Sequence, residues 1–114
     1  MLSDEKIESR MAELRELSAT YAKAYATKSY LEEFKKSKIA ILQKKYQQLG
    51  HKTTAAQERE ARADPEYLEL LDALRDATEQ SETIRWQLKN AELGIEIWRT
   101  QESSKRAEKR GYGA

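Results

Sequence analysis

The residues best suited to chemistry are a group of lysines near the middle of the chain, interleaved with aromatic side chains. Lysine ammonium groups bind phosphates as point charges, and the release of counterions then drives association. An exposed aromatic ring can stack on any base of single-stranded nucleic acid. The pattern predicts binding of single-stranded DNA, with Tyr30 and Tyr46 as stacking candidates beside Phe34. The lysines fall in a segment without any Asp or Glu: Lys35, Lys36, Lys38, Lys44, Lys45 and Lys52.

The turn after these lysines holds the only histidine of the chain, His51, between Gly50 and Lys52. A histidine beside a lysine can add a phosphate contact, so His51 joins the predicted DNA-binding residues. Taken alone, however, a histidine in a turn is more often a solvated loop residue. The lysines also have a plainer interpretation, in which Phe34 and Tyr46 are core residues and the lysines only keep a helix surface soluble.

The composition argues against catalysis. The 114 residues include one His, no Cys and four Gly, and they contain no GxSxG, HExxH, Walker-type or GxGxxG motif. The carboxylates alternate with Arg and Lys at helix-surface spacing, as in the i,i+4 pair of Glu58 and Arg62, which is typical of solvated helix faces. We therefore expect no enzyme activity, no cofactor and no metal site.

Charge is unevenly distributed, although the net charge is only +1. Residues 23–52 hold eight Lys against two Glu, a net charge of +6, and residues 103–114 carry a net charge of +3. Between them, residues 53–102 hold six basic side chains against twelve acids, a net charge of −6. Such asymmetry indicates contacts with nucleic acid or with charge-matched proteins. The acidic surface over residues 58–82 could accordingly dock a basic protein.

Helix signals divide the chain into few elements. Gly50 is a good helix stop, Thr54 and Gln57 have the spacing of a capping box, and Asp64 followed by Pro65 is a strong helix start. We expect a single helical domain over residues 1–114. Its elements are a helix over 4–49, an elbow over 50–64 with a short helix over 55–63, a helix over 65–105, and a basic tail over 106–114.

A heptad repeat runs without interruption through the second long helix, because its seam positions alternate by three and four residues. It predicts an all-α fold, an antiparallel hairpin of two long helices in a coiled coil with a short helical elbow. Trp86, Leu93 and Ile97 lie off the seam, and a two-helix hairpin has no third wall to cover them. Burying one such side chain contributes about 1.5–3 kcal/mol, so we expect a homo-oligomer. The coiled-coil or oligomer seam comprises Tyr67, Leu70, Leu74, Ala77, Ser81, Ile84, Leu88, Ala91, Ile95 and Trp98.

Neither a membrane nor export is indicated by the sequence. No apolar run approaches the roughly 20 residues that span a bilayer. Residues 1–6 include Asp4, Glu5 and Lys6, and they lack the apolar region of a signal peptide. We therefore expect a cytoplasmic protein without membrane contact.

Several segments resemble a family of small, phage-encoded, all-helical proteins, most of which are described only as hypothetical. The resemblance covers about residues 30–106 and implies a bacteriophage protein. The segments are Gly-His-Lys-Thr at 50–53, Ala-Ala-Gln-Glu-Arg-Glu-Ala at 55–61, Leu74, Ile-Arg-Trp at 84–86 and Ile-Trp-Arg at 97–99.

The layout also resembles UvsY-type recombination mediators of T-even phages, which are small, all-helical, oligomeric proteins that bind single-stranded DNA and help to load a recombinase. The resemblance implies DNA contact by Lys38 and Lys44, with Lys45 and His51 as neighbours. The chain departs from that family in its break at 64–65 and its basic tail. The shared pattern is Lys, aliphatic, Ala, aliphatic, then a basic residue, then Gly and a basic residue, here Lys38-Ile39-Ala40-Ile41, Lys44 and Gly50-His51.

Together these features predict a non-enzymatic accessory protein of phage DNA recombination, an oligomeric mediator in the cytoplasm of the infected bacterial host. Its expected partners are single-stranded DNA, further copies of itself, and a recombinase or another host or phage protein. Two alternatives remain: a phage coiled-coil protein that binds and inhibits or redirects a host protein, or a structural or assembly spacer. Charge geometry discriminates between them, because lysines exposed on one face favour DNA, whereas lysines paired with acids of the second helix disfavour it.

Overall fold

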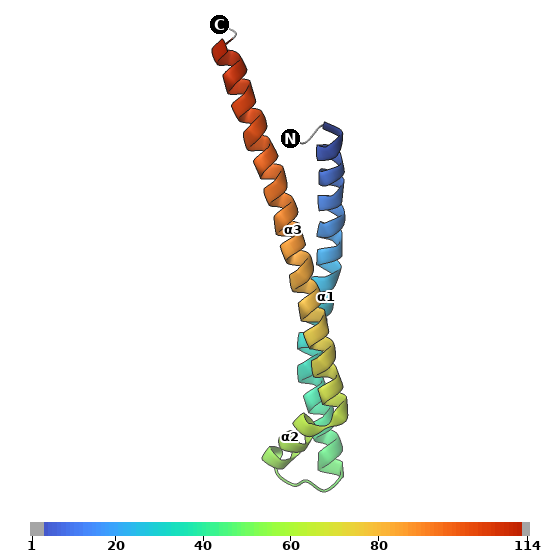
Figure 1. Cartoon of the computed structure of the whole chain (residues 1–114). Helices are drawn as coiled ribbons and strands as arrows, with labels where there is room; N and C mark the ends of the chain where they lie inside the picture. Colours follow the sequence, from blue (N-terminus) through green and yellow to red (C-terminus); the bar gives the residue numbers. More distant parts are fainter. Residues whose placement is uncertain (1–3, 113–114) are drawn as a thin grey trace. The chain divides into compact units, whose positions relative to one another are not determined.

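A computed structural model describes residues 4–112, and all of its secondary structure is helical (Figure 1). The elements are α1 (Asp4–Gln48), α2 (Thr54–Ala63) and α3 (Pro65–Tyr112). Two long helices joined through a short one confirm the predicted all-α long-helix hairpin. No helix within residues 4–112 combines the length and the apolar character needed to cross a bilayer.

The first helix is continuous and ends where the sequence predicts. No Gly or Pro occurs in α1, so nothing interrupts its backbone hydrogen bonds. Gly50 has a φ of +106°, a conformation that glycine adopts without a steric penalty. The His51 amide then donates to the Tyr46 carbonyl at 3.1 Å, and the Gly50 amide donates to the Gln47 carbonyl at 3.2 Å. These bonds satisfy carbonyls that the helix end would otherwise leave free.

The cap of α2 differs from the predicted capping box by one residue. Thr53, not Thr54, is the N-cap, and its hydroxyl oxygen accepts from the Ala56 amide at 3.1 Å. Thr53 has the extended backbone that an N-cap requires. The Gln57 side chain instead donates to the His51 carbonyl at 2.8 Å. The predicted capping box was therefore wrong, because the Gln57 side chain bonds to the turn and not to the cap residue.

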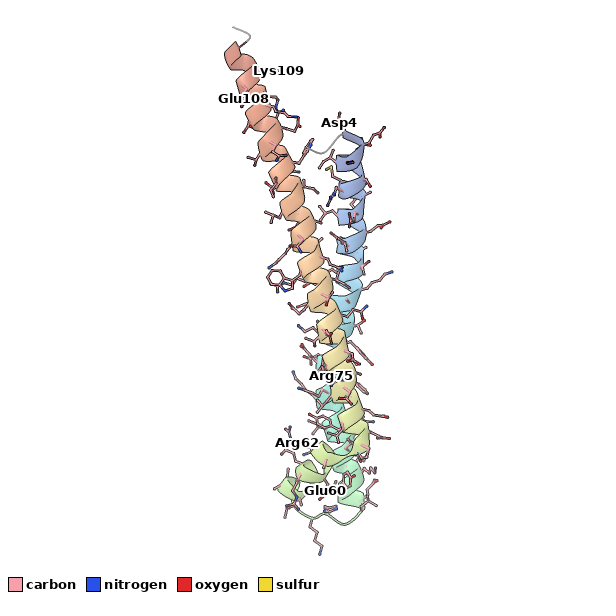
Figure 2. The ribbon with its side chains drawn as sticks, viewed as in Figure 1. Asp4, Glu60, Arg62, Arg75, Glu108 and Lys109 are labelled. Atoms are coloured by element: carbon pink, nitrogen blue, oxygen red, sulfur yellow. The ribbon has the colours of Figure 1, made fainter. Side chains whose placement is uncertain are left out.

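The start of α3 agrees with the prediction, and its end does not. Asp64 precedes the helix, and its Oδ1 accepts from the Glu66 amide at 2.8 Å. The helix predicted to end at residue 105 continues to Tyr112, so the described part of the basic tail is helical. Residues 106–110 are good helix formers, and basic side chains in the last turn interact favourably with the helix dipole. Figure 2 labels Glu108 and Lys109 on these turns.

The chain groups into two compact units. The elbow unit comprises residues 23–82, and the terminal unit comprises residues 1–22 and 83–114. In the elbow unit, Leu42 of α1, Ala61 of α2 and Tyr67 of α3 form a buried cluster, against which Ile39 and Leu71 pack. In the terminal unit, the described buried apolar residues are Ile7, Ile84 and Ile95.

The predicted seam of α3 is covered by the chain itself. Tyr67, Ala77, Ser81, Ile84 and Ile95 are buried, and the remaining seam positions are half-buried. Because this burial occurs within one chain, the seam closes the hairpin and requires no second copy. The half-buried positions are Leu70, Leu74, Leu88, Ala91 and Trp98.

Candidate nucleic-acid interface

α1 contributes a seam of its own, and lysines form part of it. A lysine at a seam position lays its methylene stem on apolar neighbours and extends its ammonium group to the edge. Lys35 and Lys38 therefore do not belong to a fully exposed basic face. The spacing of this seam is visible in the sequence, but the apolar residues alone do not reveal it, because lysines occupy several of its positions. Buried or half-buried positions alternate by three and four: Tyr21, Ala24, Lys28, Leu31, Lys35, Lys38 and Leu42.

Two of the predicted DNA contacts form ion pairs with acids beyond α1. The ammonium nitrogen of Lys38 lies 3.0 Å from a carboxylate oxygen of Glu66 in α3. The ammonium nitrogen of Lys45 lies 3.2 Å from Oδ2 of Asp64, the residue that caps α3. These pairs connect α1 to the start of α3 within the elbow unit. A phosphate would have to compete with a carboxylate for each of these two lysines.

Asp64 is the centre of a polar cluster at the junction of α2 and α3. It is only 3% exposed, and its two carboxylate oxygens accept from three groups. Oδ2 accepts from the Tyr46 hydroxyl at 2.7 Å and from the Lys45 ammonium at 3.2 Å. Oδ1 accepts from the Glu66 amide. A buried carboxylate is tolerated because its oxygens are paired in this way. The sequence had identified Asp64 only as a helix cap.

The hydrogen bonds of this cluster shift three pKa values. The hydroxyl of Tyr46, followed by the Glu66 amide and Lys45, holds the pKa of the Asp64 carboxyl below its ordinary value. The same hydrogen bond to Asp64 raises the pKa of the Tyr46 hydroxyl, because the donated proton is retained. The hydrogen bond to Asp64 and its negative charge raise the pKa of Lys45. The cluster therefore favours a charged Asp64, a charged Lys45 and a neutral Tyr46.

Tyr46 and His51 are engaged with each other at the elbow. Their rings meet edge to face, with centroids 5.7 Å apart, and the Lys45 ammonium lies 5.3 Å from the centroid of the Tyr46 ring. His51 is half-buried, and its carbonyl is occupied by Gln57. These contacts give both residues a structural role at the end of α1. They leave Tyr30 as the more accessible of the two stacking candidates.

Tyr30 lies on α1 with its ring largely in solvent. It is 66% exposed, and it stacks on Phe34 with ring centroids 5.9 Å apart and an interplanar angle of 8°. Parallel aromatic rings on one helix offer a flat surface of the kind that a base can extend by stacking.

Three lysines of the predicted site remain on the surface of the elbow unit. Lys36 pairs with Glu33 at 3.2 Å, but both side chains are highly exposed, and such pairs contribute about 0–1 kcal/mol. Lys44 and Lys52 are exposed, and neither is paired with an acid within residues 4–112. These three ammonium groups are therefore available to phosphate.

Metal binding is not indicated by the arrangement of the described side chains. No group of three or more His, Asp or Glu side chains in residues 4–112 is placed to hold a metal ion. The carboxylates of α2 illustrate the reason. Glu58 pairs with Arg62 at 2.9 Å along the helix surface, and Figure 2 labels Arg62 and Glu60 on that helix.

Known proteins provide no comparison for this arrangement. The phage family and the UvsY-type layout therefore stay resemblances of sequence pattern. The candidate interface depends on the residues and contacts of this chain alone. No protein-family model, curated protein or solved structure matches the sequence or the fold.

Proposed function

We propose that this protein is a non-enzymatic accessory protein of phage DNA recombination, a mediator that binds single-stranded DNA with its elbow unit. The supporting observation is the excess of available lysine there. Lys44 and Lys52 are exposed without an acidic partner among the described residues, and Lys36 has only a solvated one. No Asp or Glu lies between Phe34 and Lys52 to oppose them.

The contacts of such a site are with the DNA backbone and with the faces of bases. The lysines bind phosphates, and Tyr30, stacked on Phe34, accepts a base on its open side. Neither contact reads a sequence, so binding is sequence-independent and depends steeply on salt. One elbow unit offers few phosphate contacts. Several copies acting on one strand would multiply them through effective concentration.

The ion pairs divide the predicted DNA-binding residues into two groups. Lys38 and Lys45 hold α1 to Glu66 and Asp64, so they position the elbow unit. Lys44 and Lys52 then provide the principal phosphate contacts, with Lys36 beside them. The UvsY-type resemblance implies DNA contact by both Lys38 and Lys44. In the present proposal only Lys44 of these two is a principal phosphate contact.

The test is fluorescence anisotropy of a labelled single-stranded oligonucleotide over a series of salt concentrations. The variant is Lys44→Ala with Lys52→Ala, and the matched control is Arg10→Ala with Arg15→Ala, which removes the same charge from exposed positions of the terminal unit. Losing two phosphate contacts should reduce the salt dependence of log K by about 1.4, at roughly 0.7 per contact for single strands. Equal affinity and equal slope in the two double variants would exclude this site.

A second candidate function is supported by the pairing of Lys38 and Lys45 with acids. If the lysines serve to hold the helices together, the elbow is a structural junction. The chain is then a phage coiled-coil protein that binds a host protein or acts as an assembly spacer. The same experiment discriminates, because absence of DNA binding at low salt would favour this alternative.

A further inference from the structure

The second half of α3 carries apolar side chains that the hairpin leaves in solvent. Trp86, Leu93 and Ile97, here called the outer stripe, are 57%, 58% and 51% exposed. At about 100° per residue, the three side chains share one face of α3. The buried seam residues Ile84 and Ile95 lie on the opposite face. α1, which covers the seam in the terminal unit, therefore leaves the outer stripe uncovered.

We propose that the outer stripe docks the outer stripe of a second copy of this chain. The two α3 helices lie antiparallel, and a two-fold axis passes between Asn90 and Ala91. In this register, Trp86 of each copy inserts between Leu93 and Ile97 of the other. A two-fold contact uses the same patch on both partners, so the patch must complement itself. The spacing of the outer stripe meets that condition.

The charges beside the outer stripe complement themselves only in the antiparallel arrangement. Along one flank, Arg85 and Lys89 precede Glu92 and Glu96. The proposed register places Lys89 opposite Glu92 and Arg85 opposite Glu96 of the other copy. A parallel two-fold pair would place this flank against the uncharged flank of the other copy, which carries Gln87 and Asn90, so the four charges would have no opposite charges facing them.

The contacts that these charged side chains make within one chain are compatible with pairing across the proposed dimer. The Arg85 guanidinium and the Lys89 ammonium lie 5.9 and 4.8 Å from the Trp86 ring. Both cations are therefore already beside the outer stripe. Glu96 pairs with Arg99 at 3.0 Å, with both side chains mostly exposed, and such solvated pairs are weak.

The glycine at position 94 independently supports a close contact between two α3 helices. Glycine in the middle of a helix is unfavourable relative to alanine, so its presence calls for a reason. A Cβ atom at Gly94 would meet nothing within 4 Å, so packing within this chain does not require glycine there. On the uncharged flank of the outer stripe, the proposed register places Gly94 opposite Gln87 of the other copy. The missing side chain allows the two helices to approach closely.

The first experiment determines the mass in solution without DNA, by light scattering over a range of protein concentrations. The wild type should dimerise, and Leu93→Glu should be monomeric because it places a charge within the contact. The matched control is Leu68→Glu, which changes an exposed leucine of the same helix in the elbow unit and should remain dimeric. Circular dichroism verifies that all three proteins are helical. A wild type that stays monomeric at every concentration, or a dimeric Leu93→Glu, would overturn the proposal.

The second experiment tests the register. Lys89→Glu should weaken dimerisation on the order of tenfold, because it opposes Glu92 of the other copy. Adding Glu92→Lys to that variant restores opposite charges in the antiparallel register alone. The double variant should dimerise nearly as well as the wild type, and failure of this rescue would overturn the register. The proposal is independent of the proposed function, because neither experiment contains DNA and neither alters Lys44 or Lys52.

Discussion

The Tyr46 hydroxyl donates a 2.7 Å hydrogen bond to the buried carboxylate of Asp64, and so joins the last turns of α1 to the cap of α3. Lys45 approaches the same oxygen at 3.2 Å. Consecutive residues of one helix thus share a single acceptor. This arrangement accounts for the three shifted pKa values of the elbow unit. It also makes the stability of the hairpin dependent on pH.

The first prediction concerns acid. The pKa of Asp64 is lower in the folded chain than its ordinary 3.8, so its contribution to stability is complete above about pH 4. That contribution should disappear as the pH falls through the lowered value. Urea unfolding midpoints between pH 2 and pH 7, followed by circular dichroism, measure this loss. Asp64→Asn should flatten the acid part of the curve, and an unchanged pH dependence in that variant would assign the effect to other carboxyls.

At alkaline pH, the direction of the effect reverses. The pKa values of Lys45 and Tyr46 are raised above their ordinary 10.5 and 10.0. Their contributions are complete below about pH 10 and should be lost as the pH rises through the raised values. The same urea series, continued to pH 12, gives the measurement. A curve that stays level to pH 12 would contradict this prediction.

The second prediction isolates the tyrosine hydroxyl. Tyr46→Phe keeps the ring against His51 and removes the largest cause of the lowered Asp64 pKa. The pKa of Asp64 should rise toward its ordinary value, and the melting temperature should fall by several degrees. Carboxyl titration by NMR measures the pKa, and Tyr25→Phe provides a control at a more exposed tyrosine of the same helix. No change in the pKa of Asp64 would show that Lys45 and the Glu66 amide are sufficient to hold that pKa low.

The third prediction concerns the core of the elbow unit. Leu42 is only 1% exposed and packs with Ala61 and Tyr67. Leu42→Ala should therefore lower the free energy of unfolding by about 2–5 kcal/mol. The neighbouring Ile41 is largely exposed, so Ile41→Ala should change it by about 0.5 kcal/mol or less. Similar losses in both variants would mean that Ile41 is covered in solution.

The ends of the elements were predictable where a local signal is strong. Gly50 supplies a positive φ, and Asp64 with Pro65 supplies both a cap and a first residue without an amide donor to satisfy. The α3 seam was equally accessible, because spacing by three and four residues determines a face whatever covers it. The cap of α2 was displaced by one residue, since two threonines stand side by side and either can serve as an N-cap.

The pairing of the lysines could not be derived from the sequence. It depends on which residues of α1 lie opposite Glu66 and Asp64, and that register is determined by how α2 folds back. Following apolar residues alone also concealed the seam positions of Lys35 and Lys38, which are half-buried. A long aliphatic stem can occupy such a position. The candidate site was therefore predicted in the correct segment, without the division between paired and available lysines.

The fourth prediction concerns Trp98 at the end of the seam. Its Nε1 is buried and has no hydrogen-bond partner in the described part of the chain, and an unsatisfied buried donor costs roughly 1–3 kcal/mol. Trp98→Phe removes that donor and keeps most of the apolar surface. It should therefore leave the free energy of unfolding unchanged or raise it by up to about 1 kcal/mol. Urea unfolding gives the value, with Trp98→Ala as the variant that loses the packing as well. A loss above about 1 kcal/mol in Trp98→Phe would show that the indole has a partner, such as an ordered water.

Trp98→Phe also leaves Trp86 as the only tryptophan of the chain. A blue shift of the Trp86 emission with rising protein concentration would therefore report burial of the outer stripe directly.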